Sequence, residues 1–200
     1  MNKENVGVIV GGEIEVIVLD KDGKEIHREK KPMDSFTRNI MNLIAMFDTN
    51  VWYANDVNGD SVYFAFKKAN DNYLYDASVL APAGEDKYGI LVGSSDMAFE
   101  VTQYNLGSKI SHGTGSGQLQ YGETLVADYG NDYKTWQRAF DNLSGADIVV
   151  KEIGMFAKVV REEAGVPKDY YVMLARDVIT TTTVPNGGRL IVKYTFKINP

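Results

Sequence analysis

The chain contains no cysteine and only two histidines, so it lacks most of the side chains that catalytic and metal sites use. Without a thiol there is no disulfide, no thiolate nucleophile and no cysteine-ligated metal, and the protein is compatible with a reducing cytoplasm. His27 and His112 lie far apart, and neither belongs to a spacing such as HExxH. We therefore predict no catalytic residues, no metal site and no cofactor, and we do not expect an enzyme.

The chain also lacks a surplus of basic residues and any apolar run of the roughly 20 residues that a membrane span needs. Its 27 acidic and 21 basic residues give a net charge of −6, which repels nucleic-acid phosphates and anionic lipids. Residues 1–10 include Lys3 and Glu4 and no sustained apolar segment, so we expect no secretory signal. The sequence thus predicts neither a nucleic-acid partner nor membrane binding.

Two short motifs resemble ligand-binding loops, but each lacks an essential residue. Residues 113–117, GTGSG, have neither the lysine of a phosphate-binding loop nor the spacing of a dinucleotide fingerprint, which favours a mobile loop. Asp56, Asn58 and Asp60 have the spacing that begins a calcium loop, but the sixth position is not glycine and the twelfth, Lys67, is not glutamate. We interpret them as a turn, with a looser surface calcium site as the alternative.

Most of the chain has the alternation of apolar and polar residues that predicts β-strands with one buried face. Residues 6–19 and 25–30 form a predicted hairpin around the turn at Asp20–Lys24. The clearest alternation is at the end, where Leu190, Val192 and Tyr194 begin one apolar face. Further strand candidates are residues 62–66, 88–92, 136–140, 148–160 and 170–183.

One segment changes to helical spacing: apolar residues recur every three or four positions within Ser35–Phe47, and Asp34 or Ser35 is placed to cap its start. Asn39 falls on the polar side of this predicted helix. The absence of strand–helix alternation argues against a parallel sheet. We predict one mainly β domain over residues 1–200, an antiparallel β-sandwich or barrel-like fold with one amphipathic helix near the N-terminus.

Aromatic residues gather in the loop-rich middle of the chain, at Trp52, Tyr53, Tyr73 and Tyr75. Such side chains stack on sugar rings, but they also anchor contacts between subunits, and composition alone does not choose between these roles. They are therefore candidate interface or glycan contacts.

Two charged residues stand within apolar strand candidates. We expect Glu152 and Arg176 to form a partly buried ion pair across neighbouring strands, which would fix their register more than it stabilises the fold.

Several segments resemble a widespread kind of tailed-phage virion structural protein associated with the tail, neck or capsid. The resemblance begins at the Ser35–Asn39 helix start and extends to the C-terminus. The matching segments of the second half are Gly89–Ser94, Ser108–Gly113, Gly117–Tyr121, Arg138–Gly145, Val150–Phe156, Leu174–Val178 and Val184–Leu190.

The resemblance implies a virion component that is made in the host cytoplasm and acts by protein–protein assembly, as a capsid decoration, neck or tail protein. Its partners would be further copies of itself and other virion proteins. A homo-oligomer follows from the symmetry of viral particles. The alternative function is a host-surface carbohydrate-binding module of the virion. The resemblance implies no catalytic or cofactor residues.

Overall fold

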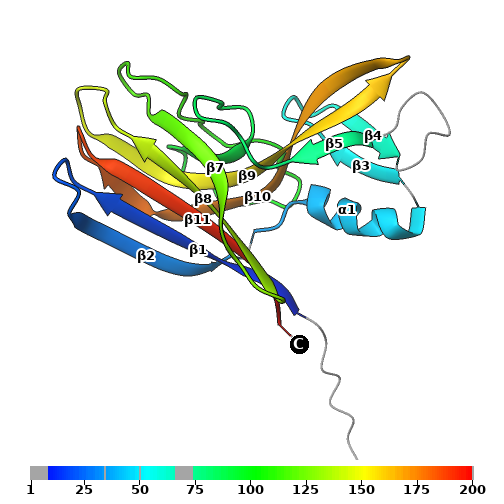
Figure 1. The fold of residues 1–200 in the computed structure, drawn as a ribbon, viewed down its shortest axis with the longest axis horizontal. Coiled ribbons are helices and arrows are strands. Elements are labelled where there is room, and N and C mark those ends of the chain that lie inside the picture. The colour runs from blue at the N-terminus through cyan, green and yellow to red at the C-terminus, as the bar shows by residue number, and fades with distance from the viewer. Residues whose placement is uncertain (1–8, 34, 50, 66–73, 200) are drawn as a thin grey trace, which may run out of the picture.

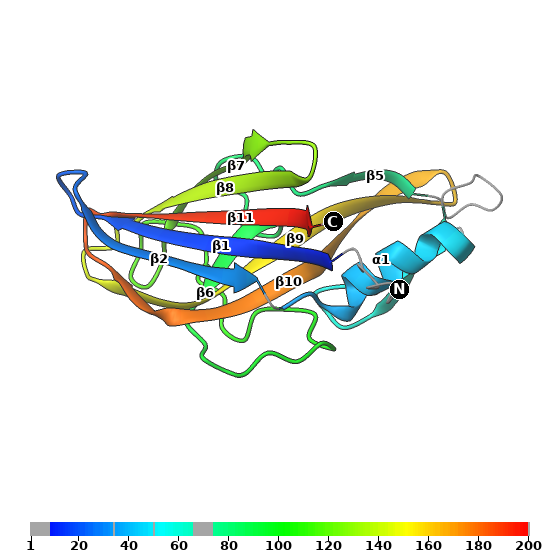
Figure 2. The same cartoon turned by 90° about the horizontal axis from the view of Figure 1, so that it is seen from below.

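The computed structural model describes residues 9–33, 35–49, 51–65 and 74–199 as two packed antiparallel sheets, a small hairpin and one helix (Figure 1, Figure 2). This confirms the predicted mainly β sandwich with a helix near the N-terminus. The elements are β1 (Ile9–Leu19), β2 (Glu25–Met33), α1 (Arg38–Thr49), β3 (Val51–Asn55), β4 (Ser61–Ala65), β5 (Leu74–Ser78), β6 (Gly89–Gly93), β7 (Gln120–Tyr129), β8 (Tyr133–Asp141), β9 (Ile148–Glu163), β10 (Val166–Val184) and β11 (Arg189–Asn199).

The larger sheet has five strands in the order β2-β1-β11-β8-β7. Its first and last strands in the sequence pair with each other, since Ile9 lies opposite Asn199 and Leu19 opposite Arg189. The residues that alternate toward the second sheet are buried, as the sequence predicts. They include Ile14, Val16, Val18, Leu190, Val192 and Tyr194.

The second sheet is built on the long β9–β10 hairpin. β10 pairs with one edge of β9, while β6 and β5 pair one after the other along its opposite edge. The half of the hairpin that includes Val150 and Val184 packs in the sandwich core. The other half extends away from the five-stranded sheet, toward β3, β4 and α1 (Figure 1). The core there includes Phe64 and Tyr170, whose ring centroids are 5.7 Å apart.

The start of the helix differs from the prediction. Residues 35–37 are extended and pair with β10: Arg176 N–H donates to Ser35 O, and Thr37 N–H donates to Leu174 O. The helix therefore begins at Arg38, and Ser35 does not cap it, while Asp34 lies outside the described residues. The Thr37 hydroxyl also donates to Met173 O. Local capping propensity is overridden here by backbone pairing with a neighbouring strand.

Asn39, which the helical spacing places on the polar side of the helix, does not face solvent. It is buried, and its side-chain amide donates to Asn55 O and Met173 O while accepting from Asn55 N–H. One residue thus fastens the helix to both β3 and β10. The only described helix, α1, is too short to cross a bilayer.

Three strands, β3, β5 and β7, are not predicted by the sequence analysis. β7 is interrupted by register shifts near Tyr121 and Val126, so its side chains do not keep a strict alternation. β3 and β5 are only five residues long. Irregular or short strands leave little periodic signal.

Candidate functional site

Arg138 is one of two fully buried arginines among the described residues. Its side chain has no exposed surface and faces the core from β8, between Trp136 and Phe140 in the alternation of that strand. The guanidinium forms no ion pair with a carboxylate of the described residues; it donates instead to five backbone carbonyl oxygens, at 2.5 to 3.2 Å. The acceptors belong to Pro82, Glu85, Tyr88, Ile90 and Gly122.

Burial lowers the pKa of Arg138 to about 10, so the group is still charged at neutral pH. The ring of Tyr121 lies 4.8 Å from the guanidinium carbon, which adds a cation–π contact. The role that this geometry supports is structural, because the N–H donors of the guanidinium are occupied by backbone carbonyls of the β5–β6 connection, of β6 and of β7. The sequence analysis did not identify this residue. An isolated arginine at an inward-facing position of a predicted strand is the signal that would have indicated a buried cation.

The second buried cation, Arg176, pairs with Glu152 as expected, at 2.7 Å between Nε and Oε2. Both side chains are fully buried rather than partly buried. The carboxylate also accepts backbone N–H groups of Ser95, Gly107 and Ser108, and the guanidinium donates to Gln103 Oε1 and Met97 O. This pair therefore organises the connection between β6 and β7: the carboxylate accepts four hydrogen bonds and the guanidinium donates three.

The four aromatic candidates have different environments. Trp52 is buried in the core, with its indole N–H donating to Asn39 O, so its assignment as a surface contact is wrong. Tyr53 is 56 % exposed and faces Tyr63 across the β3–β4 pair, with 6.3 Å between ring centroids. Tyr73 lies outside the described residues, and of Tyr75 only the backbone, in β5, is described.

The two ligand-like motifs are held by internal hydrogen bonds. The Asp56 carboxylate accepts N–H groups of Asn58 and Asp60, which closes the β3–β4 turn as the turn interpretation predicts. The GTGSG loop is tied by Gln118, whose amide oxygen accepts Gly115 N–H at 3.0 Å. No group of three or more metal-binding side chains occurs among the residues with described positions.

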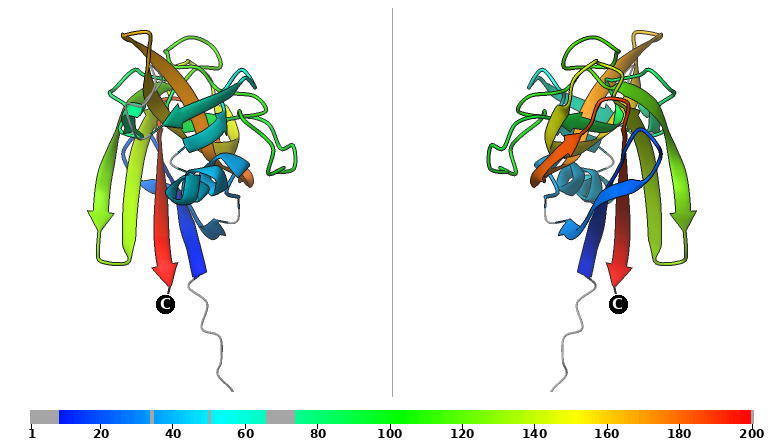
Figure 3. Two further views of the ribbon diagram at one scale, coloured as in Figure 1. Left: turned by 90° about the vertical axis from the view of Figure 1, so that its right-hand side faces the viewer. Right: turned by 90° about the vertical axis from the view of Figure 1, so that its left-hand side faces the viewer.

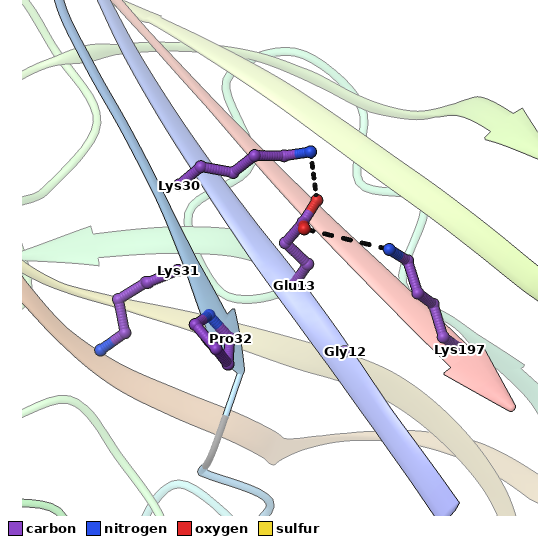
Figure 4. Close-up of a pocket in the computed structure, with 6 residues that line it drawn as sticks. All are labelled: Gly12, Glu13, Lys30, Lys31, Pro32 and Lys197. Atoms are coloured by element: carbon purple, nitrogen blue, oxygen red, sulfur yellow. Dashed lines mark ion pairs between the residues drawn. The ribbon is translucent and has the colours of Figure 1, made fainter. Parts of the chain in front are cut away.

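A shallow pocket of about 260 Å³ lies on the outer face of the five-stranded sheet (Figure 4). Glu13 on β1 bridges two cations from the flanking strands, at 2.7 Å from Lys30 Nζ and 3.9 Å from Lys197 Nζ. Lys31 points to the other side of β2, where its Nζ donates to Val178 O.

The next outward position on β1 repeats this arrangement. Glu15 accepts from Arg28 on β2 and lies 2.8 Å from Lys193 Nζ on β11. Burial acts to raise the pKa of Glu15, but these two cations outweigh it and the pKa lies below its usual value. The face is an ion-pair ladder across three strands, and its ionisable groups already satisfy one another.

A deeper groove of about 420 Å³ lies between four separate segments of the chain. Its sides come from the β3–β4 turn, the residues before β6, the β6–β7 connection and the β9–β10 hairpin. The lining residues are Val57, Asn58, Asp86, Lys87, Leu91, Asn105, Leu106, Lys109, Phe156 and Tyr171. An apolar floor with a few polar groups at the rim is the usual composition of a small-molecule site.

The third surface feature is apolar. The strands β7, β8, β11 and β1 project beyond the helix and the second sheet, at the end where β11 finishes (Figure 3). On their inner face lie Tyr129, Trp136, Phe196 and Ile198, which we call the end patch, and the same register places Lys134 beside them. Tyr129 is 75 % and Ile198 52 % exposed, and the rings of Trp136 and Phe196 are 5.2 Å apart.

Comparison with protein-family models, characterised proteins and solved structures gave no match to this chain. Arg138, Glu152 and Arg176 are buried and hold connecting segments in place. The accessible features of the described residues are an ion-pair ladder, a groove and the end patch.

Proposed function

We propose that the chain is a virion structural protein of a tailed phage, which acts by assembling with further copies of itself and with other virion proteins. The observation that carries the proposal is the end patch. Tyr129 and Ile198 leave this part of the inner face partly uncovered in the monomer, and an assembling subunit buries such a face against its neighbour.

The end patch has the composition of an interface core. Aromatic residues are enriched in such cores, and Phe196 packs edge-to-face against both Trp136 and Phe36. The patch is also held in shape, because Ile198 N–H donates to Asp132 O in the β7–β8 turn at 2.8 Å. A preorganised apolar surface loses little conformational entropy when a neighbour covers it.

The edge strand β2, on the side of the sheet away from β7, is protected against such contact. β2 carries Glu25, Arg28, Lys30 and Pro32 along its length, and charged residues and proline are the usual protection of an exposed edge strand. Association is thereby directed to one end of the molecule. A homo-oligomer built through the end patch matches the closed symmetry of viral particles.

The test is the presence of the chain in purified particles, together with its dependence on the end patch. Mass spectrometry and antibody labelling of intact virions should detect the chain. Ile198→Arg and Tyr129→Arg should shift the isolated protein toward monomer in sedimentation analysis and lower its incorporation. Val166→Arg is the matched control, because Val166 is exposed to a similar degree, 65 %, at the tip of the β9–β10 hairpin. A chain that is monomeric and absent from particles would overturn the proposal.

A further inference from the structure

The groove between the β3–β4 turn and the β9–β10 hairpin has no part in the proposed assembly, which uses the end patch of the five-stranded sheet, because the lining of the groove comes from the second sheet, its connections and the β3–β4 turn. Two of its lining residues, Val57 and Asn58, belong to the Trp52–Tyr75 region in which the sequence places a carbohydrate contact, and the other lining residues lie outside that region. Its floor is apolar: the side chains of Leu91, Leu106 and Phe156 are buried beneath it. The ring of Tyr171 lines it from β10 and stacks on Tyr88, with 6.1 Å between ring centroids.

The sides of the groove are fixed by hydrogen bonds between segments that are distant in sequence. Val57 N–H donates to Tyr171 O at 3.0 Å, and the Asn105 side-chain amide donates to Val57 O at 3.2 Å. On the other side, Lys109 Nζ lies 2.9 Å from Asp86 O and 3.2 Å from Asp86 Oδ1. A site with preformed walls binds without the cost of ordering them.

The charges at the rim leave one cation without a carboxylate partner. Lys109 is paired with Asp86, whose other oxygen accepts His112 N–H at 2.9 Å. Lys87 forms no ion pair with any described residue, and its Nζ lies 5.7 Å from the centre of the Tyr171 ring. The two lysines and one aspartate give the rim a net charge of +1, although the chain as a whole carries −6.

We propose that this groove binds one anionic saccharide unit, a sugar that carries a carboxylate or a phosphate. The apolar floor and the Tyr171 ring suit the C–H face of a sugar ring, and the amides of Asn58 and Asn105 suit its hydroxyl groups. Lys87 supplies the charge for the anionic group. The volume of about 420 Å³ accommodates one sugar residue rather than a long oligomer.

The probes are D-glucuronate, D-glucose 1-phosphate and methyl glucoside, with acetate and inorganic phosphate as the free ions. Calorimetry on the full chain should show the anionic sugars binding at least tenfold more tightly than methyl glucoside. Comparing glucuronate with glucose 1-phosphate identifies which anionic group the site prefers. Saturation-transfer NMR should show contact with the ring protons of the bound sugar.

Lys87→Gln should weaken binding of the anionic sugars about tenfold, because one charge-assisted contact is lost. Lys134→Gln is the matched control: this lysine also lies over an aromatic ring, 5.5 Å from the centre of Trp136, but far from the groove. Tyr171→Leu should reduce the ring-proton signals. If that variant does not fold, the comparison of Lys87→Gln with Lys134→Gln tests the proposal by itself.

Three results would overturn the proposal. The first is equal binding of methyl glucoside and the anionic sugars. The second is an equal loss in Lys87→Gln and Lys134→Gln, which would indicate unspecific charge attraction. The third is binding of free phosphate or acetate as tight as that of the sugars, which would make the groove a site for an adventitious ion only. Particle incorporation of Lys87→Gln should be normal, so this test and that of the assembly role fail independently.

Discussion

Arg176 and Glu152 form a fully buried ion pair that runs diagonally across two strands, because Arg176 lies opposite Gly154 and Glu152 lies opposite Val178 in the register of β9 and β10. Removing two charges from water is costly, and a buried pair stabilises a fold only when its remaining hydrogen-bonding capacity is satisfied. Here the three backbone N–H groups bound by Glu152 all come from the β6–β7 connection. The pair therefore serves to position that connection on the sheet.

We expect Glu152→Gln and Arg176→Met each to lower the free energy of unfolding by about 3 to 5 kcal/mol, since each leaves the partner charge buried and unpaired. The double variant Glu152→Leu/Arg176→Met should lose less than the sum of the two. Urea unfolding measures these changes. Hydrogen exchange in the double variant should be faster at Gly107 and Ser108, whose acceptor is gone. A double variant with native exchange and normal assembly would contradict a role in fixing register.

Arg138→Met should lower the free energy of unfolding by at least about 3 kcal/mol, because several buried carbonyl groups lose their donor. Arg138→Lys should restore only part of this, since an ammonium group does not reproduce the planar fork of a guanidinium. Chemical denaturation compares these variants with Arg189→Met. Arg189 forms an exposed pair with Asp141, so we expect that control to lose about 0 to 1 kcal/mol. Equal effects at the two arginines would refute the structural role of Arg138.

Stability should fall below about pH 4, in part through Asp86. Burial acts to raise the pKa of this carboxyl, but the hydrogen bond from His112 N–H and the charge of Lys109 outweigh it and hold the pKa below its usual value of about 3.9. A lowered folded-state pKa contributes stability above the unfolded-state pKa, and this contribution is lost as the pH falls through the folded-state pKa.

Asp86→Asn should therefore lower the free energy of unfolding by about 1 to 2 kcal/mol at pH 7 and have a smaller effect at pH 3. The measurement is urea unfolding at both pH values, with Asp22→Asn in the exposed β1–β2 turn as the comparison. If Asp86→Asn destabilises the protein equally at both pH values, the interactions of the ionised carboxylate are not the cause.

Trp52 and Tyr53 are neighbours in sequence with opposite environments, and alanine variants should separate them. Trp52→Ala should cost about 3 to 5 kcal/mol, because it empties a core position beside Phe64. Tyr53→Ala should cost less than about 1 kcal/mol, the usual size of a cross-strand pair contribution. Thermal unfolding is the measurement. A small loss for Trp52→Ala would mean that this side chain is not a core residue in solution.

The sequence predicts the strongly periodic parts of the fold well, because one-sided burial imposes the alternation directly. The β1–β2 hairpin and β11 are examples, since Ile14, Val16, Leu190 and Val192 all face the core. The ion pair of Glu152 and Arg176 is also predictable, since charges within apolar strands need partners. Trp52 is misassigned because its surroundings contain turn residues, which indicate a loop, although one face of its strand is buried.

Other features depend on contacts between distant segments and leave no local signal. The capping of α1 is changed by the pairing of Ser35 and Thr37 with β10, some 140 residues away. The groove joins Asn58, Lys87, Asn105 and Tyr171, which no spacing rule connects. Sites of this kind follow from topology and not from motifs.

The continuous pairing of β9 with β10 has a mechanical consequence. The two strands stay paired from Glu163 and Val166 at the tip to Ile148 and Val184 inside the sandwich, apart from two register shifts. The two strands are joined covalently at the tip, so a pull on the tip along the hairpin is carried by both backbones together, while the perpendicular inter-strand hydrogen bonds keep the strands side by side. The hairpin therefore acts as a stiff rod, which transmits tension from its tip into the sandwich while its two strands stay paired.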